Sequence, residues 1–226
     1  MKKTILLILL FSLTINSVFS QKERKRVLII NSGVSVPFAE FAVKKMVIDA
    51  GFAGTGFNVG IDYLSSKIGW LGFTASAGYS ILNFDSKAYR SEYERILDQN
   101  GEVTVTAGNY NIFKTVAGLY LKTPEFYHLE LLFIAQLGPS FSIHPDITVD
   151  HSQYGLINST KQDHDWALIS NLGMKVNYNI SDRYGVNLSY CLNYLLPGFE
   201  DDSGLVYHFY MPVRFQNINL GFFINL

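Results

Sequence analysis

Residues 184–194, YGVNLSYCLNY, alternate strictly between large apolar and small polar side chains. Tyrosine, valine and leucine occupy the even positions, whereas glycine, asparagine, serine and the single cysteine occupy the odd positions. A period of two is typical of a β-strand whose two faces meet different surroundings. These residues therefore predict a strand with one apolar face and one small, polar face.

The same alternation recurs elsewhere in the chain. Seven further segments carry it: residues 27–36, 56–65, 69–82, 109–121, 127–142, 166–180 and, approximately, 212–226. Most exceed the about 5–6 residues usual for strands of soluble proteins, and reach the about 9–11 residues that a tilted transmembrane strand needs. With residues 184–195, they predict eight strands of membrane-crossing length.

The last segment changes phase near residues 216–217. Val213 and Phe215 stand at odd positions, whereas Ile218 and the apolar residues after it stand at even positions. One extra residue in a strand moves the following side chains to the opposite face. The change of phase therefore predicts a β-bulge near Gln216 and Asn217.

The lengths of the connections carry an independent signal. Short connections at residues 66–68, 122–126 and 181–183 alternate with long ones at 37–55, 83–108, 144–164 and 196–211. Outer-membrane barrels show this asymmetry, with short periplasmic turns and long extracellular loops. An even number of strands then places both termini in the periplasm. We therefore predict an all-β fold, an eight-stranded antiparallel up-and-down transmembrane β-barrel over residues 27–226.

Charged residues decide which face of the strands meets lipid. Asp62, Glu130 and Lys175 share the small, polar phase of their segments. Because an arginine or lysine on the lipid side costs about 2–4 kcal/mol at the bilayer midplane, the apolar phase is predicted to face lipid and the polar phase the lumen. Aromatic residues near segment ends would form interfacial girdles: Tyr63, Tyr79, Tyr127, Trp166, Tyr178, Tyr184 and Tyr194. The alternative is that they form the core of a soluble β-sandwich.

The N-terminus has the pattern of an export signal. Lys2 and Lys3 precede an apolar run at residues 5–15, and Val18 and Ser20 stand where cleavage requires small side chains. We predict a cleaved signal peptide at residues 1–20 and a basic periplasmic segment at residues 21–26. No cysteine stands at the cleavage point, so a lipid anchor is not expected there. A lone Cys191 has no partner for an internal disulfide.

The composition narrows the class of protein. Of the 226 residues, 48% are hydrophobic, 15% aromatic and only 16% charged, against about 25% charged in a usual globular domain. Such hydrophobicity excludes intrinsic disorder, and no run reaches the about 20 apolar residues of a membrane helix. A net charge of −1 provides no electrostatic footprint for nucleic acid.

Several short motifs, taken together, point to one family. They are Phe19-Ser20-Gln21, Gly33-Val34-Ser35-Val36-Pro37, Gly51-Phe52-Ala53-Gly54-Thr55-Gly56, Gly78-Tyr79 with Asn83-Phe84, Gly138-Pro139 and the alternating C-terminal strand. The chain thereby resembles the small eight-stranded outer-membrane β-barrel proteins, the OmpA/OmpX-type group in the form frequent in Bacteroidetes. The resemblance implies contact with outer-membrane lipid, and insertion by the barrel-assembly machinery through the C-terminal strand. Family members usually end in an aromatic residue, whereas this chain ends in Leu226.

The sequence also predicts an ion pair inside the barrel and a short helix in one of the long connections. An eight-stranded barrel is just wide enough for side chains to fill its interior, so a general porin is not expected. Inside it, Glu130 is expected to pair with Lys175 or with Lys122, and independently solvated charges are the alternative. In the link after Asp85, a candidate N-cap, helical spacing predicts a short, exposed helix or turn that carries Tyr89, Tyr93, Ile96 and Leu97.

The predicted outer loops hold residues that could in principle carry chemistry. His144, His151, His164 and His208 stand near Asp146, Asp150, Asp163, Asp165, Asp201 and Asp202. Imidazole and carboxylate groups bind metal ions, but this spacing matches no tight ligand motif. A lipid hydrolase would need a serine beside a histidine, and Ser142 with His144 or Ser152 with His151 are available. No catalytic, cofactor-binding or metal residue is assigned, and no cofactor is expected.

Three functions follow from these features. The first is a monomeric, non-enzymatic outer-membrane barrel that supports the envelope or contacts an extracellular or envelope protein through its loops. The second is an outer-membrane enzyme that modifies lipid. The third is a soluble, lipocalin-like carrier, which would require a ligand cavity inside the barrel.

Overall fold

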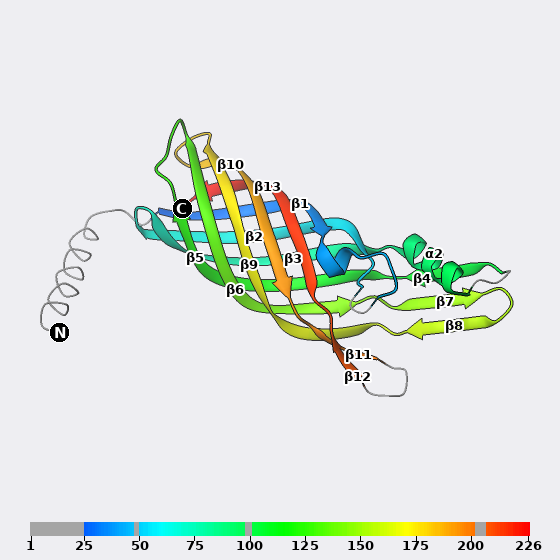
Figure 1. Ribbon diagram of the computed structural model, residues 1–226. Coiled ribbons are helices and arrows are strands. Elements are labelled where there is room, and N and C mark those ends of the chain that lie inside the picture. Colours follow the sequence, from blue (N-terminus) through cyan, green and yellow to red (C-terminus); the bar gives the residue numbers. More distant parts are fainter. Residues whose placement is uncertain (1–24, 48–49, 98–100, 202–206) are drawn as a thin grey trace, which may run out of the picture.

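The computed structural model describes residues 25–47, 50–97, 101–201 and 207–226. Eight long strands form a closed barrel in the order β1-β13-β10-β9-β6-β5-β3-β2 (Figure 1). Their bounds are β1 Lys25–Pro37, β2 Ala53–Ile68, β3 Leu71–Phe84, β5 Asn109–Lys122, β6 Leu129–His144, β9 Asp163–Asn179, β10 Tyr184–Leu195 and β13 Val213–Asn225. All neighbours pair antiparallel, and β1 pairs with β13. The predicted fold class is confirmed, and the sandwich alternative is wrong.

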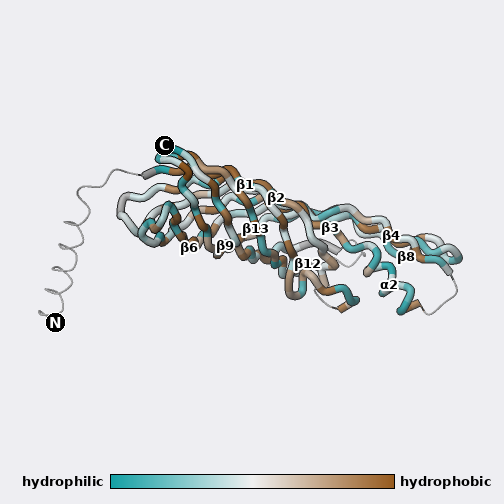
Figure 2. Tube along the Cα trace, turned by 90° about the horizontal axis from the view of Figure 1, so that it is seen from above, coloured by the Kyte–Doolittle hydropathy of each residue, from teal (hydrophilic) through white to brown (hydrophobic). Residues whose placement is uncertain are grey.

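The alternation in the sequence becomes an inside and an outside. Along β10, Asn187 and Asn193 point into the barrel and are fully buried, whereas Leu188 between them is 55% exposed on the outer wall. In Figure 2 the apolar, brown residues gather along the barrel strands, whereas α2 (Ser86–Leu97) is largely polar and teal. The polar phase therefore faces the lumen, as predicted.

The predicted β-bulge in the last strand is wrong. Gln216 pairs with Val36 on one side and with Leu192 on the other, and Asn217 follows in the same register with Ser35. Val213 and Phe215 point into the barrel, where they are 1% and 0% exposed. The pattern misled because the lumen contains an apolar layer at this height, so an apolar side chain does not always mark the outer face.

The two ends of the barrel differ, as the connection lengths predicted. At one end, called here the turn end, residues 69–70, 123–128 and 180–183 join neighbouring strands, and Leu226 donates a backbone hydrogen bond to Arg26. The opposite end, the loop end, bears the long connections. The first of them contains the short 3-10 helix η1 (Ala39–Ala42).

The other long connections contain secondary structure of their own. One three-stranded sheet has the order β4-β7-β8, with bounds Val103–Ala107, Ile147–His151 and Gly155–Thr160. A two-stranded sheet pairs β11 (Gly198–Asp201) with β12 (Tyr207–Tyr210). Figure 1 shows α2 and the three-stranded sheet extending well beyond the barrel at its loop end.

The predicted signal peptide and most of the basic segment 21–26 lie outside the described residues. Within the residues that are described, no helix combines the length and the apolar character needed to cross a bilayer.

Candidate functional site

The lumen is filled by side chains in layers. From the loop end toward the turn end, the inward positions of β13 carry Val213 and Phe215, then Asn217 and Asn219, then Phe223. The first two belong to one apolar cluster and Phe223 to another. A polar layer therefore lies between two apolar layers.

The first connection closes the loop end of the barrel from inside. Phe41 in η1 is fully buried, and its ring packs edge-on against Tyr110 with centroids 4.9 Å apart. The hydroxyl of Tyr110 donates a hydrogen bond to the carbonyl oxygen of Gly51 at 2.7 Å, at the other end of the same connection. The two contacts thus hold both ends of this connection, at Phe41 and at Gly51, beside the apolar cluster that also contains Leu195 and Phe215.

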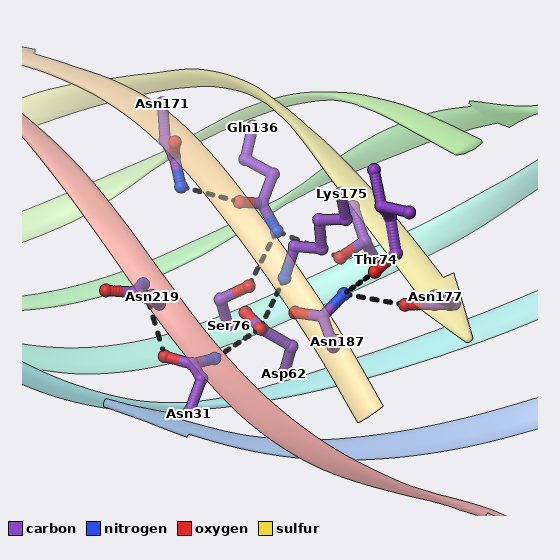
Figure 3. A network of polar contacts seen from close by, with 11 residues as sticks. Asn31, Asp62, Thr74, Ser76, Gln136, Asn171, Lys175, Asn177, Asn187 and Asn219 are labelled. Carbon is purple, nitrogen blue, oxygen red and sulfur yellow. Dashed lines mark hydrogen bonds and ion pairs between the residues drawn. The ribbon is translucent and has the colours of Figure 1, made fainter. Parts of the chain in front are cut away.

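The centre of the polar layer is a buried ion pair (Figure 3). The Lys175 ammonium group bonds to Oδ2 of Asp62, and both residues are buried. Asn31 Nδ2 donates to the same carboxylate oxygen at 2.7 Å, and Asn219 Nδ2 donates to Asn31 Oδ1 at 3.4 Å. Residues from β2, β9, β1 and β13 thus meet at one point of the lumen.

A second hub of the polar layer is the side-chain amide of Gln136. Its Nε2 donates to Thr74 Oγ1 at 3.0 Å and to Ser76 Oγ at 2.8 Å, while its Oε1 accepts from Asn171 Nδ2 at 2.9 Å. These bonds link β6 to β3 and β9 across the lumen. Because a buried polar group without a partner is costly, the network stabilises one arrangement of the strands.

The two pairings predicted for Glu130 have different outcomes. Lys122 Nζ lies 3.5 Å from Glu130 Oε1, so the second prediction is confirmed. The first is wrong, because Lys175 bonds to Asp62 instead. Both lysines are level with Leu132, so the register of the neighbouring strands does not distinguish them. Lys175 instead reaches Asp62 on β2, on the opposite side of the barrel. Phase alone placed these groups in the lumen and did not reveal a contact between strands that are not neighbours.

Space inside the polar layer is small. One cavity of about 30 Å³ lies against Asp62, Lys114, Lys175 and Cys191. Sites for small organic ligands usually measure about 300–1,000 Å³, so this cavity admits only a water-sized guest. Within the described part of the chain, this lumen cavity is therefore too small to match that of a lipocalin-like carrier.

The long connections build a folded platform, defined here as α2 with β4, β7 and β8. Tyr89, Tyr93 and Leu97 on one face of α2 pack against the buried Val103 and Val149 of the sheet. Asn158 Nδ2 donates to the Tyr93 hydroxyl at 3.0 Å. The predicted helix is thus confirmed, but one face packs against this sheet instead of standing free in solvent.

The three strands of the platform were missed from the sequence. Their signal is present but short. Val103 and Val105 alternate with threonines, and Ile147 and Val149 alternate with polar residues, each over only five residues. Segments of that length are common in loops, so the pattern alone does not separate a short strand from an irregular connection.

Asp85 is the N-cap of α2, and its charge gives the platform a pH dependence. Burial raises the pKa of Asp85, but the Ala88 N–H and the Lys44 ammonium outweigh it and hold that pKa below its usual value. The stabilisation is therefore present above the usual carboxyl range and is lost as the pH falls through the lowered pKa.

We expect Asp85→Ala to destabilise α2 by about 1 kcal/mol, measured as faster amide hydrogen exchange in α2 at neutral pH. Asp182→Ala, at the turn end, is the matched control.

Three of the four loop histidines, His144, His151 and His164, do not come together, and the side chain of His208 lies outside the described part of the chain. His144 is buried inside the barrel mouth, where Nδ1 bonds to the Pro145 carbonyl oxygen. His151 accepts a hydrogen bond from the Gln153 N–H, and the His164 ring lies tilted against Phe141 on the outer side, with centroids 5.5 Å apart. Among the described residues, no three metal-ligating side chains form a cluster.

Neither Ser–His pair forms a hydrolase site in this arrangement. Ser142 and His144 both point into the filled barrel, with Ser142 Oγ unpartnered. Ser152 Oγ instead accepts the Glu102 backbone N–H at 3.0 Å, while the neighbouring His151 ring bonds to Gln153. Nucleophilic catalysis requires the serine within hydrogen-bond reach of its base, and the described contacts of these pairs do not provide it.

Comparisons with known proteins return only structural neighbours. No protein-family model and no curated protein matches the sequence. The chain is similar to the attachment invasion locus protein Ail of Yersinia pestis, at 12% identity and a TM-score of 0.45, over 91% of this chain and 100% of that chain. It is similar to OprG of Pseudomonas aeruginosa, at 12% identity and a TM-score of 0.48, over 90% and 97%. A major outer membrane protein of Thermus thermophilus gives 11% identity and a TM-score of 0.48, over 91% and 100%.

The fold itself carries the assignment. A single sheet of eight antiparallel strands closes on itself, with a filled lumen, short turns at one end and long connections at the other. Large apolar side chains cover its outer wall. The chain has the architecture of a small eight-stranded outer-membrane β-barrel.

Proposed function

We propose that the protein is an integral outer-membrane barrel that conducts no solutes and presents its platform outside the cell. The observation that carries this proposal is the outer wall. Its exposed side chains include Ile30, Phe57, Ile61, Phe73, Leu119, Phe133, Leu137, Leu168, Leu172, Leu188, Leu220 and Phe222. Monomeric soluble proteins rarely expose contiguous apolar patches above a few hundred Å², whereas a lipid bilayer covers such a surface favourably.

Backbone pairing and aromatic placement support the same environment. A closed barrel leaves no strand edge with unpaired polar groups, as a bilayer requires. Tyr178 and Tyr184 are exposed on the outer wall near the turn end, and Tyr127 lies in a turn there. Trp166, 68% exposed, and Tyr194 stand outward toward the loop end. Two such groups match the aromatic girdles at membrane interfaces.

The filled lumen supports a non-conducting role. Phe41 and the cluster around it close one end, and a second apolar cluster with Leu64, Leu132 and Phe223 lies toward the other. We expect the purified protein to give no channel steps in planar bilayers at voltages where a general porin conducts. Sustained conductance would contradict the closed lumen and leave the membrane assignment standing.

Cell fractionation tests the membrane assignment directly. We expect the protein in the carbonate-resistant outer-membrane fraction, with an electrophoretic mobility that changes on heating because the closed barrel resists detergent until it is heated. Protein recovered in the soluble fraction, with mobility independent of heating, would overturn the assignment.

The direction of insertion is also part of the proposal. The native Cys191 is buried, so an introduced cysteine reports its own accessibility. We expect Gln153→Cys, in the exposed turn between β7 and β8, to react with a membrane-impermeant maleimide on intact cells. The matched Asp182→Cys, exposed at the turn end, should react only after the outer membrane is opened. The reverse result would invert the topology.

The platform is the part suited to contact an extracellular or envelope protein. It is folded before any partner arrives, so binding there avoids the entropic cost of ordering a flexible loop. Its β7–β8 hairpin exposes Tyr154 and Leu156 at 60% and 61%. For insertion, we propose that the barrel-assembly machinery engages β13, whose outward residues continue through Phe222 and Ile224 to Leu226.

A further inference from the structure

The small cavity in the polar layer has an unbalanced charge. Its charged lining residues are Asp62, Lys114 and Lys175, two ammonium groups and one carboxylate. The carboxylate is already engaged by Lys175 and by Asn31. Lys114 Nζ donates to the neutral Oδ1 of Asn193 at 2.6 Å. Around this cavity, one positive charge is therefore left without a matching negative charge.

A surplus charge at this position is costly. The cavity lies inside a closed barrel whose outer wall is apolar, with apolar clusters toward both ends of the lumen, and Lys114 itself is half-buried. Removing an ion from water costs several kcal/mol unless an opposite charge and hydrogen bonds replace the water. A further group that neutralises Lys114 would therefore be stabilising.

Unused hydrogen-bond donors line the same cavity. The Asn58 Nδ2 group and the Ser189 hydroxyl are 3% and 2% exposed, and neither has a hydrogen-bond partner. Buried polar groups in native proteins are generally satisfied, by protein or by a bound guest. Ammonium, amide N–H and hydroxyl groups together are a donor set for an anion. Two unpartnered acceptors, Asn171 Oδ1 and Asn219 Oδ1, suit a water beside it.

We propose that the lumen binds one small monovalent anion of the halide class, held by Lys114, Asn58 and Ser189. The volume of about 30 Å³ excludes organic anions. The anion restores electroneutrality around Asp62, Lys114 and Lys175, and it uses the two idle donors.

Two other arrangements at the same cavity would also remove the surplus positive charge. The experiments below distinguish them from a bound anion. The thiol of Cys191 also lines the cavity and would be a counter-charge as a thiolate. Alternatively, Lys114 is held as a neutral amine with water beside it. Neither solution makes the wild-type protein depend on halide.

Thermal unfolding after refolding in different anions separates these solutions. The protein is refolded from urea in sodium chloride or in sodium gluconate at equal ionic strength, since gluconate is too large for the cavity. We expect the unfolding midpoint of the wild type to be about 2–4 °C higher in chloride. No difference between the two anions would overturn the proposal.

Three variants locate the effect. Lys114→Gln should abolish the chloride dependence, whereas Lys87→Gln on the exposed surface of α2 should retain it. Chloride dependence that survives in Lys114→Gln would assign the effect to another site and overturn the proposal. Dependence that is absent from the wild type and appears in Cys191→Ala would identify the thiolate as the counter-charge, with the same consequence.

A direct measurement on the wild-type protein does not require any variant to fold. Crystals of the wild type grown in sodium bromide should show one anomalous scattering peak in the lumen, within bonding distance of Lys114 Nζ and Ser189 Oγ. Density at that place without anomalous signal would identify water and overturn the proposal.

Discussion

Replacing Asp62 by asparagine is expected to lower the free energy of unfolding by about 3–5 kcal/mol, because it leaves the buried Lys175 ammonium without its counter-charge. The substitution preserves the size and shape of the side chain, so packing against Asn31 changes little. Lys175 is 2% exposed, so bulk water does not reach it to replace the carboxylate. The measurement is urea-induced unfolding of the barrel in lipid vesicles, followed by the heat-dependent gel shift.

A double substitution distinguishes lost charge balance from general damage. Asp62→Asn combined with Lys175→Met removes both charges, and should recover a large part of the stability lost in the single variant, since an apolar replacement of a buried pair is often neutral. The matched control is Glu125→Gln, in the exposed connection at the turn end. Additive losses in the double variant would mean that Asp62 and Lys175 are not coupled.

The second large effect is expected at Phe215 of β13. Phe215→Ala should cost about 3–5 kcal/mol, because it removes a large apolar side chain and leaves a cavity in the lumen. The ring is fully buried within the apolar cluster that also holds Phe41 and Leu195. Because the same cluster closes the mouth, we also expect this variant to unfold at a lower urea concentration without losing its membrane insertion.

Phe222→Ala is the matched control, since Phe222 lies on the same strand but faces outward at 46% exposure. Lipid chains fill the space that its ring leaves, so only the transfer of the ring from water is lost, about 1.5–3 kcal/mol. Equal losses of unfolding free energy in the two variants would contradict the inward placement of Phe215. They would favour the β-bulge that the change of phase predicts.

The fold could be predicted because its determinants are local. Because side chains alternate with a period of two, the sequence of a strand shows which of its residues share a face, as in residues 184–194. The lengths of the connections indicate which strands are neighbours. The same reasoning found α2, since Asp85 and the spacing of Tyr89 and Tyr93 lie within a few turns of chain. The strand period and the helix signal are each contained in a short run of neighbouring residues, and the connection lengths follow directly from where the strands end.

The candidate site was only partly predictable, because it depends on contacts across the lumen. Phase placed Asp62, Lys175 and Glu130 inside the barrel, but it did not show that Lys175 on β9 meets Asp62 on β2, because these two strands lie on opposite sides of the barrel. Phe215 shows the same limit, since the phase of the strand predicts an outward side chain, whereas the apolar layer beside Phe41 holds it inside.

The sequence by itself determined the class of the molecule: strands of membrane-crossing length, an apolar wall, and loops sorted to one end. The tertiary structure alone decided how the interior is organised, with Phe41 folded into the mouth, Lys175 bonded to Asp62, and a small polar cavity beside Lys114. The physical reason is that alternation is a property of one strand. The meeting of two lumen side chains depends instead on the tilt and stagger of all eight strands together.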